Sequence, residues 1–281
     1  MTSNAFGSGP VLQRMARLGL FVALAIVAAP GRGQLILQGP DHFPEFRGLS
    51  GLAGGGFGTD ALGRLSLSGP TAYSTPTAYV LGHDRCFLMI DSIAGHRGFV
   101  LGGKGFQTLV GMVGHTVGHL NIAFSDMVLT GQGDQAYNLQ IEYVPSPMRL
   151  PDGSVRFPHA IFSAGIQDIG GGGGSAGDRL PGDTRSSRTV FGVVTYRMGD
   201  AERSPYVSAG VGTRRFMKGF VSASYQVLPP VRLWVEYDGF GTNFGALTTC
   251  RLRIARRPVD LQFGLVSVFG RFLATNAGLA F

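Results

Sequence analysis

The stretch Tyr137–Val144 (YNLQIEYV) alternates apolar and polar side chains at successive positions. Its odd-numbered residues are Tyr, Leu, Ile and Tyr, and the residues between them are Asn, Gln and Glu. Because successive side chains of a β-strand point to opposite faces, this period of two predicts a strand with one apolar and one polar face. Residues Val231–Tyr237 (VRLWVEY) repeat the pattern.

The same period continues, with interruptions, from about Pro76 to Phe281 and marks out further strands. The expected strands are Cys86–Ile93, Gly105–Val113, Val117–Met127, Tyr137–Val144, His159–Ile169, Arg188–Arg197, Tyr206–Gly212, Met217–Tyr225, Val231–Tyr237, Ala246–Ile254, Asp260–Leu265 and Phe272–Phe281. Many alternating strands of roughly 9–11 residues are typical of a transmembrane barrel. The sequence therefore predicts an all-β fold, a closed antiparallel transmembrane β-barrel of about 12 strands, within a range of roughly 10–14.

Composition favours a barrel over a soluble β-sandwich. Charged residues make up only 15% of the chain, against about 25% in an ordinary soluble domain. The polar strand faces consist largely of Ser, Thr, Asn, Gln and Gly, whereas a sandwich would present many charges to water. The alternative is a secreted or periplasmic β-sandwich that binds glycan or forms a coat, with Trp234 and Tyr237 in its binding surface.

The N-terminal residues have the features of an export signal. Arg14 and Arg17 precede the apolar run Leu18–Ala29, which has 12 residues, within the roughly 7–15 of a signal sequence and short of the roughly 20 that span a bilayer. Small residues at Gly31 and Gly33 suit cleavage before residue 34. We therefore expect a signal peptide at 1–33, no lipid-attachment Cys after it, and an exported protein.

The remaining chain divides into two parts. Residues 34–75 form a Gly-rich N-terminal segment with weak patterning, which we interpret as partly plugging the barrel; 76–281 form the outer-membrane β-barrel. Phe281 ends an alternating strand, as in the assembly signal of bacterial outer-membrane proteins, although Asn276 stands where that signal has Gly. These features predict localisation in the outer membrane.

The sequence offers no convincing catalytic, cofactor-binding or metal site. His115 and His119 would lie about 13 Å apart on a strand, too far for one metal ion. The run Gly170–Gly174 lacks the lysine of a phosphate loop, and no Ser/His/acid set is evident. We therefore predict a protein that is not an enzyme and uses no cofactor.

Several charged residues fall on polar strand faces and are candidates for the barrel lumen: Glu142, Glu236, Asp238, Arg251 and Arg253. Glu236 and Asp238 could form a carboxylate pair for acid–base chemistry. The preferred interpretation pairs them with Arg251 and Arg253 of the next strand, because charges inside a small barrel need partners.

Charge and cysteine content give weaker indications. The net charge is +7, but the basic residues are scattered, so no nucleic-acid partner is expected. The two cysteines, Cys86 and Cys250, allow one disulfide or none. We favour two small apolar strand residues.

Several short motifs occur in a characteristic order along the chain: PTAYV (Pro76–Val80), AGIQDIGG (Ala164–Gly171), GFV (Gly219–Val221) and WVEYDG (Trp234–Gly239). This order, over about residues 76–281, resembles the YjbH-like outer-membrane barrel proteins, which are associated with exopolysaccharide production and export. Members of that family are often lipoproteins, and this sequence lacks the lipid-attachment Cys. The resemblance implies a non-enzymatic role in exopolysaccharide or cell-envelope export. It also implies outer-membrane lipid, the barrel-assembly machinery and possible polysaccharide as partners, and it supplies no catalytic residue.

Overall fold

The computed structural model describes residues 49–93, 106–129, 134–145, 148–149, 155–156, 159–171, 188–199, 203–254, 257–268 and 272–281. The expected signal peptide, residues 1–33, lies outside the described residues, as do 34–48 of the Gly-rich segment. Among the described residues, no helix is both long enough and apolar enough to cross a membrane.

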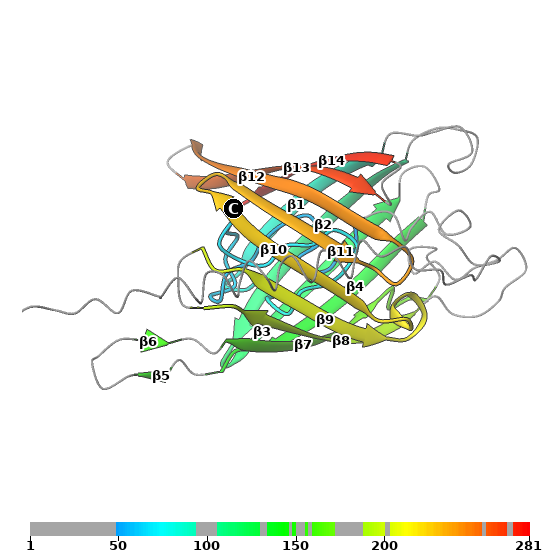
Figure 1. The fold of residues 1–281 in the computed structure, drawn as a ribbon, viewed down its shortest axis with the longest axis horizontal. Helices are drawn as coiled ribbons and strands as arrows, with labels where there is room; N and C mark the ends of the chain where they lie inside the picture. The colour runs from blue at the N-terminus through cyan, green and yellow to red at the C-terminus, as the bar shows by residue number, and fades with distance from the viewer. Residues whose placement is uncertain are drawn as a thin grey trace, which may run out of the picture. The chain divides into compact units, whose positions relative to one another are not determined.

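Twelve strands close into one antiparallel barrel (Figure 1). They are β1 (Arg85–Ile93), β2 (Phe106–Val117), β3 (Leu120–Leu129), β4 (Asp134–Tyr143), β7 (Ala160–Gln167), β8 (Thr189–Arg197), β9 (Tyr206–Gly212), β10 (Phe220–Leu228), β11 (Val231–Tyr237), β12 (Thr242–Ile254), β13 (Arg257–Val268) and β14 (Phe272–Ala280). Each strand pairs with its neighbours along the chain, and β1 pairs with β14, from Phe87 opposite Ala280 to Ile93 opposite Ala274. The predicted closed barrel of about 12 strands is confirmed, and the β-sandwich alternative is wrong.

Two further strands lie outside the barrel sheet. Strands β5 (Met148–Arg149) and β6 (Val155–Arg156) pair only with each other, in the connection between β4 and β7. A short 3-10 helix, η3 (Arg214–Phe216), lies between β9 and β10.

The alternating pattern places apolar side chains outside and polar ones inside. On β4, Tyr143 is 57% exposed, whereas Gln140 and Glu142 are 1% exposed. Large exposed apolar residues recur on this outer face of nearly every strand, among them Leu88, Ile90, Leu109, Val113, Phe124, Tyr137, Ile141, Phe162, Val190, Val211, Leu233, Phe244, Phe263, Leu265 and Leu273. A water-soluble sheet protein would bury such residues, so this exterior suits hydrocarbon.

The two ends of the barrel differ in their connections. At one end, which we call the short-turn end, connections of two residues join β2 to β3, β10 to β11 and β12 to β13. The opposite end has the connections at 94–105 and 168–188. The β4–β7 connection, which contains the β5–β6 ribbon, is the long one at the short-turn end (Figure 1).

Some strand boundaries differ from the expected ones. The strand expected at Met217–Tyr225 begins only at Phe220, because Arg214 and Gly219 have φ angles of 48° and 72° and the chain turns there. Strand β12 begins at Thr242, four residues before the expected start at Ala246. The first barrel strand begins at Arg85, nine residues after the predicted start of the barrel at residue 76.

Candidate functional site: a plugged barrel lumen

The inner barrel wall is lined by polar side chains that are almost fully buried. They include Asp91, Thr108, Asn121, Ser125, Asn138, Gln140, Glu142, Ser163, Gln167, Thr195, Ser208, Ser222, Ser224, Arg232, Glu236, Asn243, Gln262 and Asn276. Polar groups are rarely buried without hydrogen-bond partners. The chain itself supplies many of the partners, from the segment that precedes the first strand.

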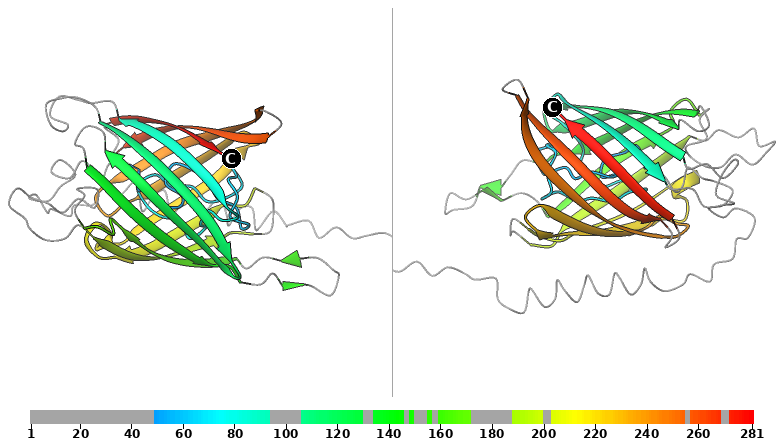
Figure 2. Two further views of the ribbon diagram at one scale, coloured as in Figure 1. Left: turned by 180° about the vertical axis from the view of Figure 1, so that it is seen from behind. Right: turned by 90° about the horizontal axis from the view of Figure 1, so that it is seen from above.

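Residues Leu49–Asp84, which we call the plug, run through the interior of the barrel as irregular chain (Figure 2). Most plug residues up to Gly82 are buried, and the hydrogen bonds of the plug reach the inner face of nine strands. Two isolated bridges, Gly55 with Ala72 and Thr59 with Leu65, give the plug its only pairing within the described residues.

Glycine permits the tight folding of the plug. A Cβ on Gly69 would lie 2.0 Å from the carbonyl oxygen of Thr59, so no larger residue fits there without a backbone shift. This contact accounts for part of the glycine content of a segment whose sequence shows no strand pattern.

Glu236, on the inner face of β11, binds the plug at three consecutive residues. Its Oε2 accepts hydrogen bonds from the backbone N–H groups of Tyr73 (3.0 Å) and Thr75 (3.1 Å) and from the Thr75 hydroxyl (2.7 Å). Its Oε1 accepts from the N–H (2.8 Å) and hydroxyl (2.7 Å) of Ser74 and from Asn243 Nδ2 (2.8 Å). Hydrogen bonds to a charged acceptor contribute about 1.5–3 kcal/mol each. Glu236 is therefore the densest single attachment between the described plug and the barrel wall.

Tyr73 adds an aromatic anchor beside this carboxylate. Its ring stacks on Trp234 with centroids 6.1 Å apart, and its hydroxyl donates to Asp91 Oδ2 at 2.7 Å. Burial, and then the Asp91 carboxylate, raise the pKa of Tyr73 well above its usual value. The hydroxyl therefore stays protonated and remains a donor to the wall.

A second attachment lies across the lumen on β4. The Ala53 N–H donates to Gln140 Oε1 at 3.0 Å, and Gln140 Nε2 donates to the Thr77 carbonyl at 2.7 Å. The Val80 N–H donates to Glu142 Oε2 at 2.7 Å. Because four strands separate β4 from β11 in the barrel, the plug is held on more than one side.

Two buried arginines bind plug carbonyl groups. Arg232 of β11 donates to the Leu67 carbonyl and, at 3.0 Å, to Ser224 Oγ. Arg215 of η3 donates to the Ser74 carbonyl at 3.1 Å. The roles of these two arginines were not predicted from the sequence. Alternation at Arg232 does not show whether the side chain faces solvent or a peptide carbonyl, and Arg215 lies in a short 3-10 helix that the alternating pattern does not predict.

The predicted lumen charges separate into two groups. Glu142, Glu236 and Asp238 are buried inside, and Arg251 and Arg253 are exposed at the short-turn end. Residue Glu236 lies opposite Asn243, and Arg251 lies opposite Asp260, whose carboxylate it contacts at 2.6 and 3.1 Å. The expected pairing between the two groups does not form, because β12 has 13 residues and its arginines lie beyond its paired stretch with β11.

Asp238 directly follows β11 and stabilises the turn to β12. Its Oδ1 accepts from the N–H groups of Phe240 and Gly241 at 2.9 Å each. Burial, and then the nearby Glu236 carboxylate, raise the pKa of Asp238 to about 6. Both carboxylates are occupied by plug and turn donors, which favours a structural role over acid–base chemistry.

The histidines and cysteines that the sequence analysis discussed as possible metal or disulfide sites do not form such sites in the lumen. His115 is at the end of β2 and contacts Asp84, whereas His119 is in the following turn, so the two do not share one strand. Within the described ranges, no group of three or more His, Cys, Asp or Glu could hold a metal ion. Cys86 and Cys250 are both free. Residues 172–174 of the glycine run lie outside the described residues.

No family model matches the chain, and no curated protein matches it. Among solved structures, the chain is similar to the KdgM porin, with 9% identity, a TM-score of 0.43, and coverage of 70% of this chain and 98% of that one. It is also similar to the Acinetobacter baumannii outer membrane protein Omp33, with 12% identity, a TM-score of 0.39, and coverage of 70% and 97%. A triple mutant of the Rhodopseudomonas blastica porin follows, with 13% identity, a TM-score of 0.33, and coverage of 63% and 55%. The fold assignment rests on the strand pairing described above.

Proposed function

We propose that this protein is a non-enzymatic barrel of the bacterial outer membrane whose lumen the plug closes. The observation that supports the proposal most directly is that the strands place apolar side chains on the outer surface and polar side chains against the plug, the reverse of a water-soluble protein. A closed barrel satisfies all backbone hydrogen bonds between its strands, as a segment in hydrocarbon requires. Its strands of 7–13 residues bracket the roughly 9–11 that cross a bilayer when tilted.

The proposed role is passage of an envelope component, with exopolysaccharide export as the specific form that the YjbH-like resemblance implies. Because the plug fills the inner wall's hydrogen-bonding sites, any passage requires that it leave at least part of the lumen. The proposed partners are outer-membrane lipid, the barrel-assembly machinery and an exported polysaccharide. Export through a signal at 1–33 belongs to the same proposal.

Localisation is tested by fractionating cells that express the tagged protein and running the membrane fraction boiled and unboiled on an SDS gel. We expect outer-membrane recovery and a boiling-dependent change in migration, because folded barrels resist SDS. Recovery of soluble protein with no such change would contradict the proposal.

The closed lumen is tested by conductance in planar bilayers. The wild-type barrel should conduct rarely, and a variant lacking Leu49–Leu81 should show persistent open channels. Should that deletion prevent folding, the substitution Glu236→Gln provides the same comparison in a full-length chain. Equal conductance of wild type and a folded plug variant would refute the gating role.

Exopolysaccharide export is tested separately by deleting the gene and measuring secreted polysaccharide. Loss of secretion that is restored by the wild-type gene would support the specific role. Unchanged secretion would refute it while leaving the barrel and plug intact.

A further inference from the structure

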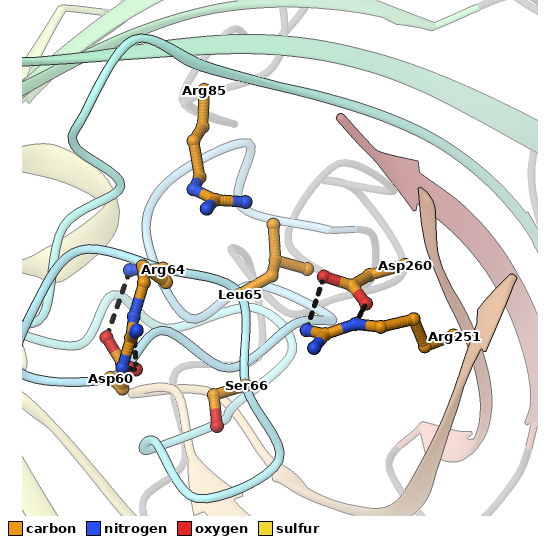
Figure 3. Close-up of a pocket in the computed structure, with 7 residues that line it drawn as sticks. All are labelled: Asp60, Arg64, Leu65, Ser66, Arg85, Arg251 and Asp260. Atoms are coloured by element: carbon orange, nitrogen blue, oxygen red, sulfur yellow. Dashed lines mark hydrogen bonds and ion pairs between the residues drawn. The ribbon is translucent and has the colours of Figure 1, made fainter. Parts of the chain in front are cut away.

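A pocket of about 300 Å³ lies where the plug meets β1, β12 and β13 at the short-turn end (Figure 3). The plug contributes Asp60, Arg64 and Leu65, and the barrel contributes Arg85, Arg251 and Asp260. A second pocket of about 220 Å³ shares Leu65, Arg251 and Asp260 and adds Gln262. A molecule bound here would therefore touch the plug and the wall together.

Two of the three pocket arginines already have carboxylate partners. Arg64 contacts Asp60 Oδ2 at 2.9 and 3.1 Å, and Arg251 contacts Asp260 through two bonds. Arg85 contacts no carboxylate among the described residues. Its buried Nε also lacks a hydrogen-bond partner there. In Figure 3 its guanidinium group extends toward the pocket with no interaction drawn to it. The pocket thus holds one surplus positive charge, three arginines against two aspartates.

Gln262 supplies a second, independent indication of a ligand. It is 1% exposed and lines the adjoining pocket. Neither its amide nitrogen nor its amide oxygen has a partner within the described part of the chain. A buried amide left in this state is costly, and it requires one donor and one acceptor from whatever occupies the pocket.

These groups define the chemistry of the ligand. The guanidinium of Arg85, which contacts no carboxylate among the described residues, suits an anionic oxygen pair, which a carboxylate offers in matching geometry. The Gln262 amide and the two Arg–Asp pairs offer donors and acceptors side by side, as needed for hydroxyl groups. The volume lies at the lower limit of the roughly 300–1,000 Å³ of small-molecule sites. We infer that this pocket binds an anionic saccharide, a sugar ring that carries a carboxylate.

This inference deepens the proposed export role, on which it rests only for the direction of approach. Short connections face the periplasm in outer-membrane barrels, so the pocket would lie at the mouth that an exported polymer meets first. Binding there would contact Arg64 on the plug, which gives the ligand a direct route to plug displacement.

The test uses the full-length barrel folded in detergent micelles, with ligand binding followed by saturation-transfer NMR. The probes are glucuronate, glucose and inorganic phosphate. Glucuronate differs from glucose by the carboxylate alone, and phosphate carries the charge without the ring. The variants are Arg85→Gln and Gln262→Leu, with Arg203→Gln as control because Arg203 is exposed and lines neither pocket.

We expect glucuronate to bind and glucose to bind at least about tenfold more weakly, since a charge-assisted pair is lost. Arg85→Gln and Gln262→Leu should each weaken glucuronate binding about tenfold or more, and Arg203→Gln should not. The boiled and unboiled gel verifies that each variant is folded. Absence of glucuronate binding, or binding indifferent to Arg85, would overturn the site.

Phosphate binding as tight as glucuronate binding and insensitive to Gln262→Leu would overturn the saccharide assignment. None of these outcomes depends on conductance or secretion. A failed binding test therefore leaves the proposed barrel function standing, and a failed conductance test leaves the binding site standing.

Discussion

Replacing Glu236 by glutamine should release the plug from β11. Each carboxylate oxygen accepts three hydrogen bonds, and the two oxygens together receive the N–H groups of Tyr73, Ser74 and Thr75. Whichever oxygen becomes the amide nitrogen, at least one buried plug N–H then faces another donor. That N–H costs about 1–3 kcal/mol, and loss of charge from the remaining bonds adds about 1 kcal/mol.

A total of about 2–4 kcal/mol corresponds to a change of roughly 30- to 1,000-fold in the ratio of closed to open plug. Single-channel recording in planar bilayers measures this ratio as the fraction of time spent open. Glu142→Gln should have a smaller effect, because Glu142 accepts one plug N–H, from Val80. Asp126→Asn is the control, since Asp126 bonds Gln135 and contacts no plug residue through a described hydrogen bond.

The reasoning would be refuted by a folded Glu236→Gln barrel whose open fraction equals that of wild type and Asp126→Asn. An equal effect of Glu142→Gln would also count against it, because the number of plug bonds would then not determine plug release.

Further substitutions separate the outer wall, the plug and the sheet. Leu265→Arg should lower the free energy of unfolding in lipid vesicles by about 2–4 kcal/mol, as for a charge on a lipid-facing strand position. Leu265 is 51% exposed, so the same change on a soluble protein would be neutral. Urea titration measures the free energy of unfolding. Gly69→Ala should weaken plug docking by about 1–3 kcal/mol, seen as a raised open fraction, because its Cβ would meet the Thr59 carbonyl. Gly192→Ala should change neither stability nor open fraction, since open space surrounds that position; a defect equal to that of Gly69→Ala would count against the steric argument.

The strands were predictable because a period of two is a local property. Strands Tyr206–Gly212 and Val231–Tyr237 begin and end where the alternation does. The position of β10 was harder, because Met217 and Gly219 continue the alternation in sequence while Gly219 has a positive φ. Alternation alone therefore does not predict the turn that the positive φ of Gly219 produces.

The plug attachments could not be derived in the same way. Tyr73 and Glu236 are 163 residues apart in the chain and meet only because twelve strands close around the plug. An aperiodic Gly-rich segment carries no signal for its partners. The alternating pattern does place Glu236 on the polar, inward face of its strand. It does not specify whether the carboxylate binds an arginine or a peptide N–H.

The seam between β1 and β14 has a consequence for how this protein is assembled. The plug precedes β1 in the chain, while the last strand supplies the final edge that completes the ring. Once that edge has joined, the Tyr73–Thr75 segment first reaches Glu236 only by entering through one end of the barrel. We therefore expect the plug to bind the inner face of the sheet before β14 pairs with β1. In that order of assembly, the plug N–H groups that bind Glu236 would already hold β11 against the plug when the two edge strands meet.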